Sequence, residues 1–194
     1  MKYDEWLDVW LDNYVEPTTK SRTYELYRQL AAEHIKPVLG ERELDDIKPI
    51  DIQELVTILL KKGNVLTGSG LSAGTVNLII TIVQNSLRTA FMAGEAKTYI
   101  ADRIKRPKLK QKSVICFTLS EQRKIEKAAL GDKRSKMVGV VICLYTGLRI
   151  GELLALKWSD VDLKNEMISV NKTCRDGRTE DGYGRIVDAP KTIS

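Results

Sequence analysis

Residues 144–162 read Leu-Tyr-Thr-Gly-Leu-Arg-Ile-Gly-Glu-Leu-Leu-Ala-Leu-Lys-Trp-Ser-Asp-Val-Asp, and this stretch guides the interpretation of the whole chain. An apolar segment leads to Gly147, which can end a helix in a left-handed conformation. Arg149 then begins a second helix, where free backbone N–H groups and the positive end of the helix dipole favour an anion. The guanidinium of Arg149 adds two parallel donors that match the oxygens of a phosphate.

Two neighbours of Arg149 support a site at this helix start. Gly151 allows another group to approach the backbone closely. Glu152 lies three residues after Arg149, on the same helix face, where it can orient the guanidinium. A second interpretation stays open, because an exposed Arg–Glu pair on a helix contributes only about 0.3–0.5 kcal/mol and needs no function.

The same stretch resembles the first active-site box of the tyrosine recombinase (phage integrase) family. That box is written T-G-L-R-x-G-E-L-x-x-L-x-W-x-D-[IV]-D, and residues 146–162 match every fixed position. Residues 5–7, 23–40 and 71–76 are similar to the helical core-binding domain of integrases from phages and conjugative transposons. The resemblance therefore extends over essentially the whole chain.

The resemblance implies a mainly α fold with a small β-hairpin. A helical-bundle core-binding (SAM-like) domain would precede the first part of an α+β catalytic domain, and the two would clamp duplex DNA. The family cuts DNA through a 3′-phosphotyrosine and uses no ATP, cofactor or obligatory metal. Arg149 would be the first catalytic arginine, Glu152 the acidic residue that steadies the site, and Lys191 the hairpin lysine that protonates the leaving oxygen.

The sequence also departs from the family pattern. The second box, His-x-x-Arg, is absent, because the single histidine is His34 in the first half. The second catalytic arginine and the nucleophilic tyrosine are expected beyond Ser194, while Tyr145 is expected in the core and Tyr183 in a hairpin loop. We therefore expect a recombinase that assembles on DNA as a whole protein, and a 194-residue chain that is inactive alone. The alternative is a non-enzymatic DNA-binding module, or a truncated integrase that occupies attachment sites.

The charge distribution favours a nucleic-acid partner. Residues 1–102 carry 11 Lys/Arg and 15 Asp/Glu, whereas residues 103–194 carry 20 and 11. Six of the ten residues from 103 to 112 are basic, and Pro107 prevents an uninterrupted helix there. We interpret this stretch as a segment that lies along phosphates rather than a merely solvated linker. It separates the expected core-binding domain (1–102) from the catalytic part (116–194), as a linker over 103–115.

Hydrophobic periodicity predicts the elements around these motifs. It predicts helices over 3–14, 24–35, 49–59, 72–91, 119–130, 137–145 and 149–157, and strands over 167–170 and 185–188. The polar residues 174–184 are expected to form a loop, and the apolar helix 137–145 is expected to be buried. Trp6, Trp10 and Trp158 are expected as core anchors.

The sequence argues against several kinds of site and partner. Widely spaced cysteines and a single histidine argue against a disulfide framework and a metal site. The longest apolar stretch is far shorter than the roughly 20 residues of a membrane span, so we expect a cytoplasmic protein without a membrane partner. Asp160 and Asp162 are expected to fix a turn.

The expected DNA contacts are Lys20, Arg22, Arg28, Thr75, Asn77, Arg88, Arg103, Lys105, Arg106, Lys108, Lys110 and Lys112.

Overall fold

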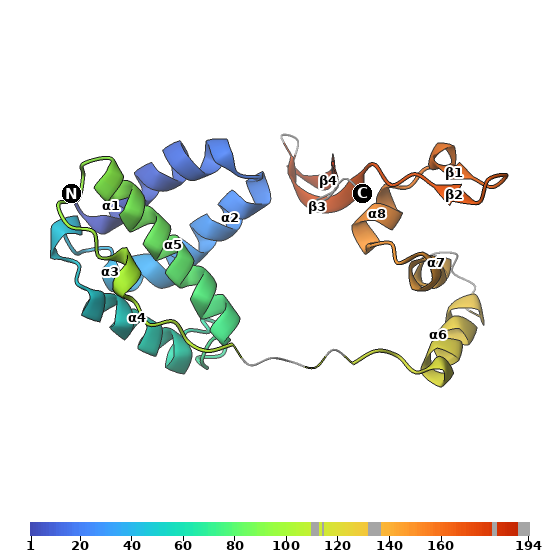
Figure 1. The fold of residues 1–194 in the computed structure, drawn as a ribbon, viewed down its shortest axis with the longest axis horizontal. Coiled ribbons are helices and arrows are strands. Elements are labelled where there is room, and N and C mark those ends of the chain that lie inside the picture. Colours follow the sequence, from blue (N-terminus) through green and yellow to red (C-terminus); the bar gives the residue numbers. More distant parts are fainter. Residues whose placement is uncertain (110–112, 114, 132–136, 180–181, 190–194) are drawn as a thin grey trace. The chain divides into compact units, whose positions relative to one another are not determined.

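The computed structural model describes residues 1–109, 113, 115–131, 137–179 and 182–189. The chain divides into two compact units, Met1–Lys112 and Ser113–Ser194 (Figure 1). The first unit is helical, and the strands described in the second pair into antiparallel hairpins. The mainly α fold with a small β-hairpin, predicted from the sequence, is confirmed.

The first unit is a bundle around the long helix α5 (Figure 1). Its α-helices are α1 (Tyr3–Trp10), α2 (Ser21–Leu30), α3 (Lys36–Leu39), α4 (Pro49–Lys62) and α5 (Ala73–Met92). Two π-helical turns, η1 (Leu11–Val15) and η3 (Ala31–Ile35), continue α1 and α2. Three 3-10 turns complete the unit: η2 (Glu16–Thr18), η4 (Leu44–Asp46) and η5 (Ala101–Arg103).

Local sequence signals set the ends of α4 and α5. Pro49 occupies the first helical position of α4, where its missing N–H costs nothing. Gly63 follows the last turn, and its N–H donates to the carbonyl of Leu59 at 3.1 Å. Ser72 caps α5, because its Oγ accepts the N–H of Thr75 at 3.2 Å.

The core of the first unit joins α1 to α5. Trp6 and Trp10 are buried, which confirms the expectation for both. The Trp6 Nε1–H donates to the Ser86 carbonyl at 3.0 Å, and the Tyr3 hydroxyl and Ser86 Oγ share a hydrogen bond of 2.7 Å. The polar tips of both aromatic side chains are thus satisfied inside an otherwise apolar cluster.

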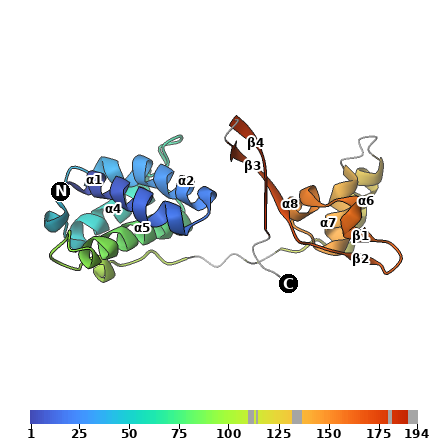
Figure 2. The same cartoon turned by 90° about the horizontal axis from the view of Figure 1, so that it is seen from above.

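The second unit consists of short helices followed by two hairpins. The helices are α6 (Leu119–Gly131), α7 (Val138–Thr146) and α8 (Ile150–Ala155), with the 3-10 turn η7 (Trp158–Asp160). Strands β1 (Val161–Asp162) and β2 (Met167–Ile168) form the short hairpin. Strands β3 (Thr173–Thr179) and β4 (Gly182–Asp188) form the longer one, in the register Thr173↔Asp188 to Thr179↔Gly182 (Figure 2).

Several expectations drawn from the sequence for the second unit are wrong. No residue of α7 is buried, and Tyr145 and Trp158 are 68% and 86% exposed instead of lying in the core. The described residues of this unit do not cover α7 completely, so its apolar side chains remain accessible to solvent. Most of the expected loop 174–184 is also strand: residues 174–179 belong to β3, and residues 182–184 belong to β4. Tyr183, expected in that loop, therefore lies on β4, because backbone pairing of the two strands outweighs the polar, glycine-bearing composition.

Within residues 1–109, 113, 115–131, 137–179 and 182–189, no helix combines the length and the apolar character that a membrane crossing requires.

Candidate functional site

Arg149 and Glu152 form a compact pair at the start of α8. The backbone N–H of Arg149 donates to Glu152 Oε2 at 2.9 Å, and its Nη1 donates to Oε1 at 2.9 Å. The side chain of Glu152 is 10% exposed, whereas that of Arg149 is 74% exposed. Glu152 is therefore largely buried, and its carboxylate fixes one edge of the exposed Arg149 guanidinium.

Two glycines make this placement possible. Gly147 ends α7 with a φ of 70°, a conformation that residues with a Cβ rarely adopt, and turns the chain toward α8. Gly151 lies against β3: a Cβ there would come within 2.6 Å of Thr173 Oγ1 and 2.9 Å of the Cys174 carbonyl oxygen. The β3–β4 hairpin therefore packs closely against the backbone of Gly151.

Arg149 stabilises the ionised form of Glu152 and keeps part of its guanidinium available for another partner. The hydrogen bond from the Arg149 backbone, followed by that from its side chain, holds the pKa of Glu152 below its usual range. Among the described residues, Nε and Nη2 of Arg149 have no hydrogen-bond partner. The arginine can thus present an open edge to an anion while Glu152 holds the other.

Three further residues of the second unit were singled out in the sequence: Lys191 as a catalytic residue, and Asp160 and Asp162 as residues that fix a turn. Lys191 lies outside the described residues. Asp162 accepts the N–H groups of Lys164 and Asn165 at 3.0 Å each, so it fixes the β1–β2 turn as expected. Asp160 accepts the N–H of Lys157 at 2.9 Å and likewise shapes the entry into β1.

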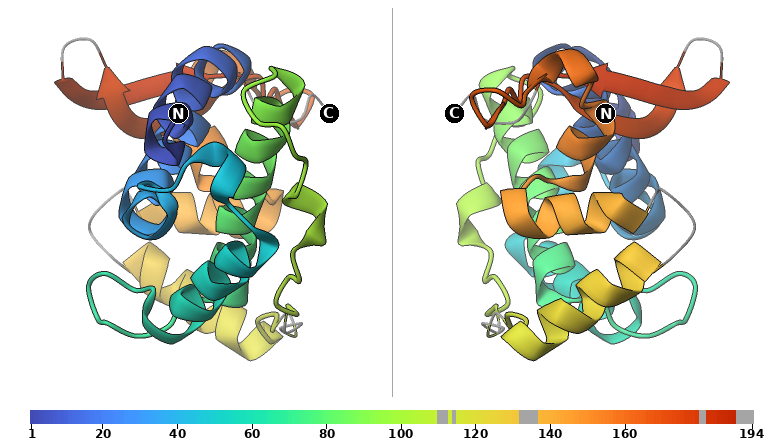
Figure 3. Two further views of the ribbon diagram at one scale, coloured as in Figure 1. Left: turned by 90° about the vertical axis from the view of Figure 1, so that its left-hand side faces the viewer. Right: turned by 90° about the vertical axis from the view of Figure 1, so that its right-hand side faces the viewer.

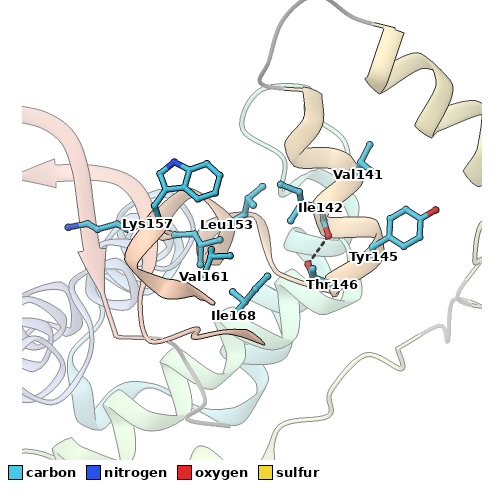
Figure 4. Close-up of a pocket in the computed structure, with 10 residues that line it drawn as sticks. Val141, Ile142, Tyr145, Thr146, Leu153, Lys157, Val161 and Ile168 are labelled. Carbon is cyan, nitrogen blue, oxygen red and sulfur yellow. Dashed lines mark hydrogen bonds between the residues drawn. The ribbon is translucent and has the colours of Figure 1, made fainter. Parts of the chain in front are cut away.

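An apolar groove of about 610 Å³ lies beside this site, between α7, α8 and the β1–β2 hairpin. Figure 4 shows Ile142, Leu153, Val161 and Ile168 converging on it, while the hydroxyl of Thr146 donates to the Ile142 carbonyl. The described residues that line the groove include no convergent set of acids, bases or nucleophiles. Its lining residues are Val141, Ile142, Tyr145, Thr146, Leu153, Leu156, Lys157, Trp158, Val161 and Ile168.

The predicted DNA contacts at α2 are all exposed, but Arg28 differs from the others because acidic side chains lie near it. Lys20 and Arg22 are exposed at the start of α2. Arg28 is exposed as well, but it borders a cavity of about 580 Å³ with an acidic wall. That cavity is lined by Asp8, Leu11, Asp12, Glu16, Tyr24 and Arg28. The three acids, Asp8, Asp12 and Glu16, are spaced four residues apart, a helical spacing in the sequence that could have indicated this acidic wall.

The predicted contacts on α5 have partners within the unit. Thr75 belongs to the Ser72 cap, with an Oγ–Oγ distance of 2.9 Å. Asn77 donates through Nδ2 to the Pro107 carbonyl at 3.1 Å. Arg88 donates through Nε to the Tyr99 hydroxyl at 3.1 Å and forms an ion pair with Asp102 at 3.3 Å.

The basic stretch is partly packed against the first unit. Arg103, Lys105, Arg106 and Lys108 are exposed, and Arg106 in addition bonds to side chains of α5. Lys110 and Lys112 lie outside the described residues. The structure thus brings Asn77 of α5 into contact with Arg106 of the basic stretch, a relationship that no sequence pattern indicated.

Known proteins resemble both units. The family model "Phage integrase, N-terminal SAM-like domain" matches residues 2–60, and the model "Phage integrase family" matches residues 117–181. The chain is 25% identical over 175 residues to a shufflon-specific DNA recombinase of Escherichia coli, covering 88% of this chain and 45% of that protein. It is 27% identical over 179 residues to the ICEBs1 integrase of Bacillus subtilis, covering 91% and 45%.

Solved structures share the fold. The integrase of the Tn1549 transposon, residues 82–397 in complex with circular intermediate DNA, matches with a TM-score of 0.78 at 21% identity, over 98% of this chain and 61% of that one. A lambda integrase dimer bound to a COC′ core site matches with a TM-score of 0.70 at 21% identity, over 97% and 62%. The chain thus spans less than half of the curated relatives named above and about three fifths of these structures.

Proposed function

The chain belongs to the phage integrase family of tyrosine recombinases, and we propose that it binds duplex DNA and holds the scissile phosphate in site-specific recombination. The observation that carries this proposal is the open edge of the Arg149 guanidinium, whose opposite edge is bonded to the largely buried Glu152. A held but exposed guanidinium suits a phosphate whose charge grows in the transition state.

Further contacts with the DNA backbone come from exposed basic side chains. In the described residues of the first unit, no ion pair or hydrogen bond engages the charged ends of Lys20, Arg22, Arg103, Lys105 and Lys108. Phosphate contacts of this kind position a protein on DNA but carry little sequence information. Arg28 and Arg88 lie next to carboxylates, which weakens their attraction for phosphate.

The activity of the whole protein is proposed from the family: strand cleavage and rejoining through a 3′-phosphotyrosine, on DNA occupied by several copies. Arg149 would stabilise the phosphate, Glu152 would position Arg149, and Lys191 would protonate the departing oxygen. The protein would work as part of a mobile genetic element, in the cytoplasm. No His-x-x-Arg segment occurs in the 194 residues, which favours a DNA-binding role without cleavage for this chain on its own.

A binding assay tests the Arg149 contact. Fluorescence anisotropy with a 30-base-pair duplex of mixed sequence would be recorded over a series of salt concentrations. Arg149→Ala should weaken binding and reduce the slope of log affinity against log salt by about 0.9, the value for one lost phosphate contact. Arg123→Ala in α6 is the matched control, because it removes the same charge from the same unit. Equal effects of both substitutions would contradict the proposed phosphate contact.

A second assay tests cleavage. Incubation of the 194-residue chain with a nicked suicide duplex should yield no covalent protein–DNA adduct. Tyr145 donates its hydroxyl to Glu126 at 2.8 Å, and Tyr183 is exposed on β4. An adduct that disappears in Tyr145→Phe or Tyr183→Phe would contradict the inactivity of the chain and identify the nucleophile.

A further inference from the structure

Residues 104–107, here called the strap, are fixed along α5. Ile104 is 9% exposed and belongs to the core of the first unit. The N–H of Lys105 donates to Gln53 Oε1 of α4 at 3.3 Å, and the carbonyl of Pro107 accepts from Asn77 Nδ2. Figure 3 shows this segment, after η5, running beside α5. The strap is thus bonded at both ends and is part of the first unit.

Arg106 is the most heavily bonded residue of the strap. Its Nη1 donates to the Asn77 carbonyl and to Thr81 Oγ1, both at 3.2 Å. Its Nη2 donates to Thr81 Oγ1 at 3.1 Å and to Gln84 Oε1. These four bonds match the four N–H groups on the two Nη atoms, so the paired donors that would fit a phosphate are already occupied.

The described acceptors of Arg106 are all neutral: the Asn77 carbonyl, Thr81 Oγ1 and Gln84 Oε1. Thr81 donates its own hydroxyl to the Asn77 carbonyl at 2.9 Å, which leaves its lone pairs for the guanidinium. Asn77 Oδ1 is buried and has no partner among the described residues, so this amide is turned into the unit and away from a ligand. The contacts hold the strap without cancelling its charge, and the side chains of Lys105 within the strap and of Lys108 directly after it are exposed.

We propose that Arg106 is a positioning residue: it fastens the strap to α5, without touching phosphate itself, and so holds Lys105 and Lys108 where they meet the DNA backbone. This inference rests on the proposed DNA-binding function. It divides the basic stretch by role, because Arg106 acts through Thr81 and Gln84 while the two lysines act on DNA.

A double-mutant cycle in the full chain separates the two roles. Thr81→Val/Gln84→Met removes the side-chain acceptors and keeps every positive charge. It should weaken binding to the 30-base-pair duplex about three- to tenfold, since side chains that were held must then be ordered on binding. Arg106→Ala should cause a similar loss alone and almost none when added to Thr81→Val/Gln84→Met.

A direct phosphate contact by Arg106 predicts the opposite pattern. Freeing the guanidinium in Thr81→Val/Gln84→Met would leave binding unchanged or tighter. Arg106→Ala would then reduce the salt slope by about 0.9 in both backgrounds. Either result overturns the positioning role. Lys105→Ala/Lys108→Ala should reduce the slope by about 1.8, and an unchanged slope overturns the role of the lysines.

Hydrogen exchange provides a readout that does not involve DNA. In the free protein, Arg106→Ala and Thr81→Val/Gln84→Met should each accelerate exchange of the Lys105 amide at least about tenfold, with amides in the middle of α5 unchanged. Unchanged exchange in both variants overturns the fastening of the strap. If the wild-type chain binds no duplex, the proposed function and the role of the lysines fail together, while exchange still decides the fastening.

Discussion

Arg149 and Glu152 hold each other through two separate bonds, one from the backbone and one from the side chain of the arginine, each 2.9 Å long. The carboxylate therefore serves as the N-terminal cap of α8 and as the support of the guanidinium at the same time. Because both roles need the ionised acid, the fold of α8 and the placement of Arg149 depend on one protonation state.

The pH dependence of this pair is the first prediction. The pKa of Glu152 is lowered in the fold, mainly by the backbone bond, so its stabilising contribution is full above the unfolded pKa and is lost as pH falls through the folded pKa. Glu121 and Asp162 also have lowered pKa values, so the second unit should lose stability below about pH 4. Thermal unfolding at pH 6 and pH 3.5 measures the loss, and Glu152→Gln should reduce it.

Arg149→Met separates the two causes of the lowered pKa of Glu152. It removes the side-chain donor but keeps the backbone N–H, which makes the larger contribution. A carboxyl NMR titration should therefore show the pKa of Glu152 rising only part of the way to its usual value. If the pKa of Glu152 returned completely to its usual value, the guanidinium of Arg149 and not its backbone N–H would set the protonation state of Glu152.

The second prediction concerns the contact between α8 and β3. Gly151→Ala would place a Cβ 2.9 Å from the Cys174 carbonyl oxygen, a backbone atom that cannot move aside alone. We expect a loss of about 1–3 kcal/mol in the free energy of unfolding, as for other overpacked sites. Gly184→Ala is the matched control in the same unit, because its Cβ would meet only Thr179 side-chain atoms at 3.6 and 3.7 Å. Urea unfolding of both variants measures the difference, and equal losses would contradict the close approach.

The sequence predicted the first unit well because its helices carry their own signals. Ser72, Pro49 and Gly63 mark helix ends through local chemistry, and the apolar spacing around Trp6 selects the buried face. The Arg149–Glu152 pair was predictable for the same reason, since three residues on a helix fix a shared face. Each of these features depends on neighbours within one or two turns.

The errors came from features that depend on distant parts of the chain. The apolar composition of α7 predicts burial only if another layer covers it, and no local pattern reports that layer. The strand β3 follows from pairing with β4, although Gly177 and its polar neighbours favour a loop. The fastening of Arg106 to Thr81 likewise joins residues 25 positions apart, where spacing carries no information.

The third prediction compares two tryptophans. Trp158 is 86% exposed at the rim of the apolar groove, whereas Trp6 is 2% exposed in the core. Trp158→Gln should change the free energy of unfolding by no more than about 0.5 kcal/mol, while Trp6→Ala should cost about 3–5 kcal/mol. Iodide quenching of fluorescence should be strong for the wild type and weak for Trp158→Gln. A large loss of stability in Trp158→Gln would show that the groove is closed in solution.

The fourth prediction concerns Arg88, whose guanidinium lies 5.9 Å from the centre of the Tyr99 ring and pairs with Asp102. Both charged side chains are more than half exposed, so the pair contributes little to folding, and Asp102→Asn should leave the melting temperature nearly unchanged. The substitution removes a negative charge beside a candidate phosphate contact and should tighten binding of the mixed-sequence duplex at low salt. Arg88→Ala should then weaken binding more in Asp102→Asn than in the wild type. Equal effects of Arg88→Ala in both backgrounds would mean that Arg88 only joins α5 to the segment after it.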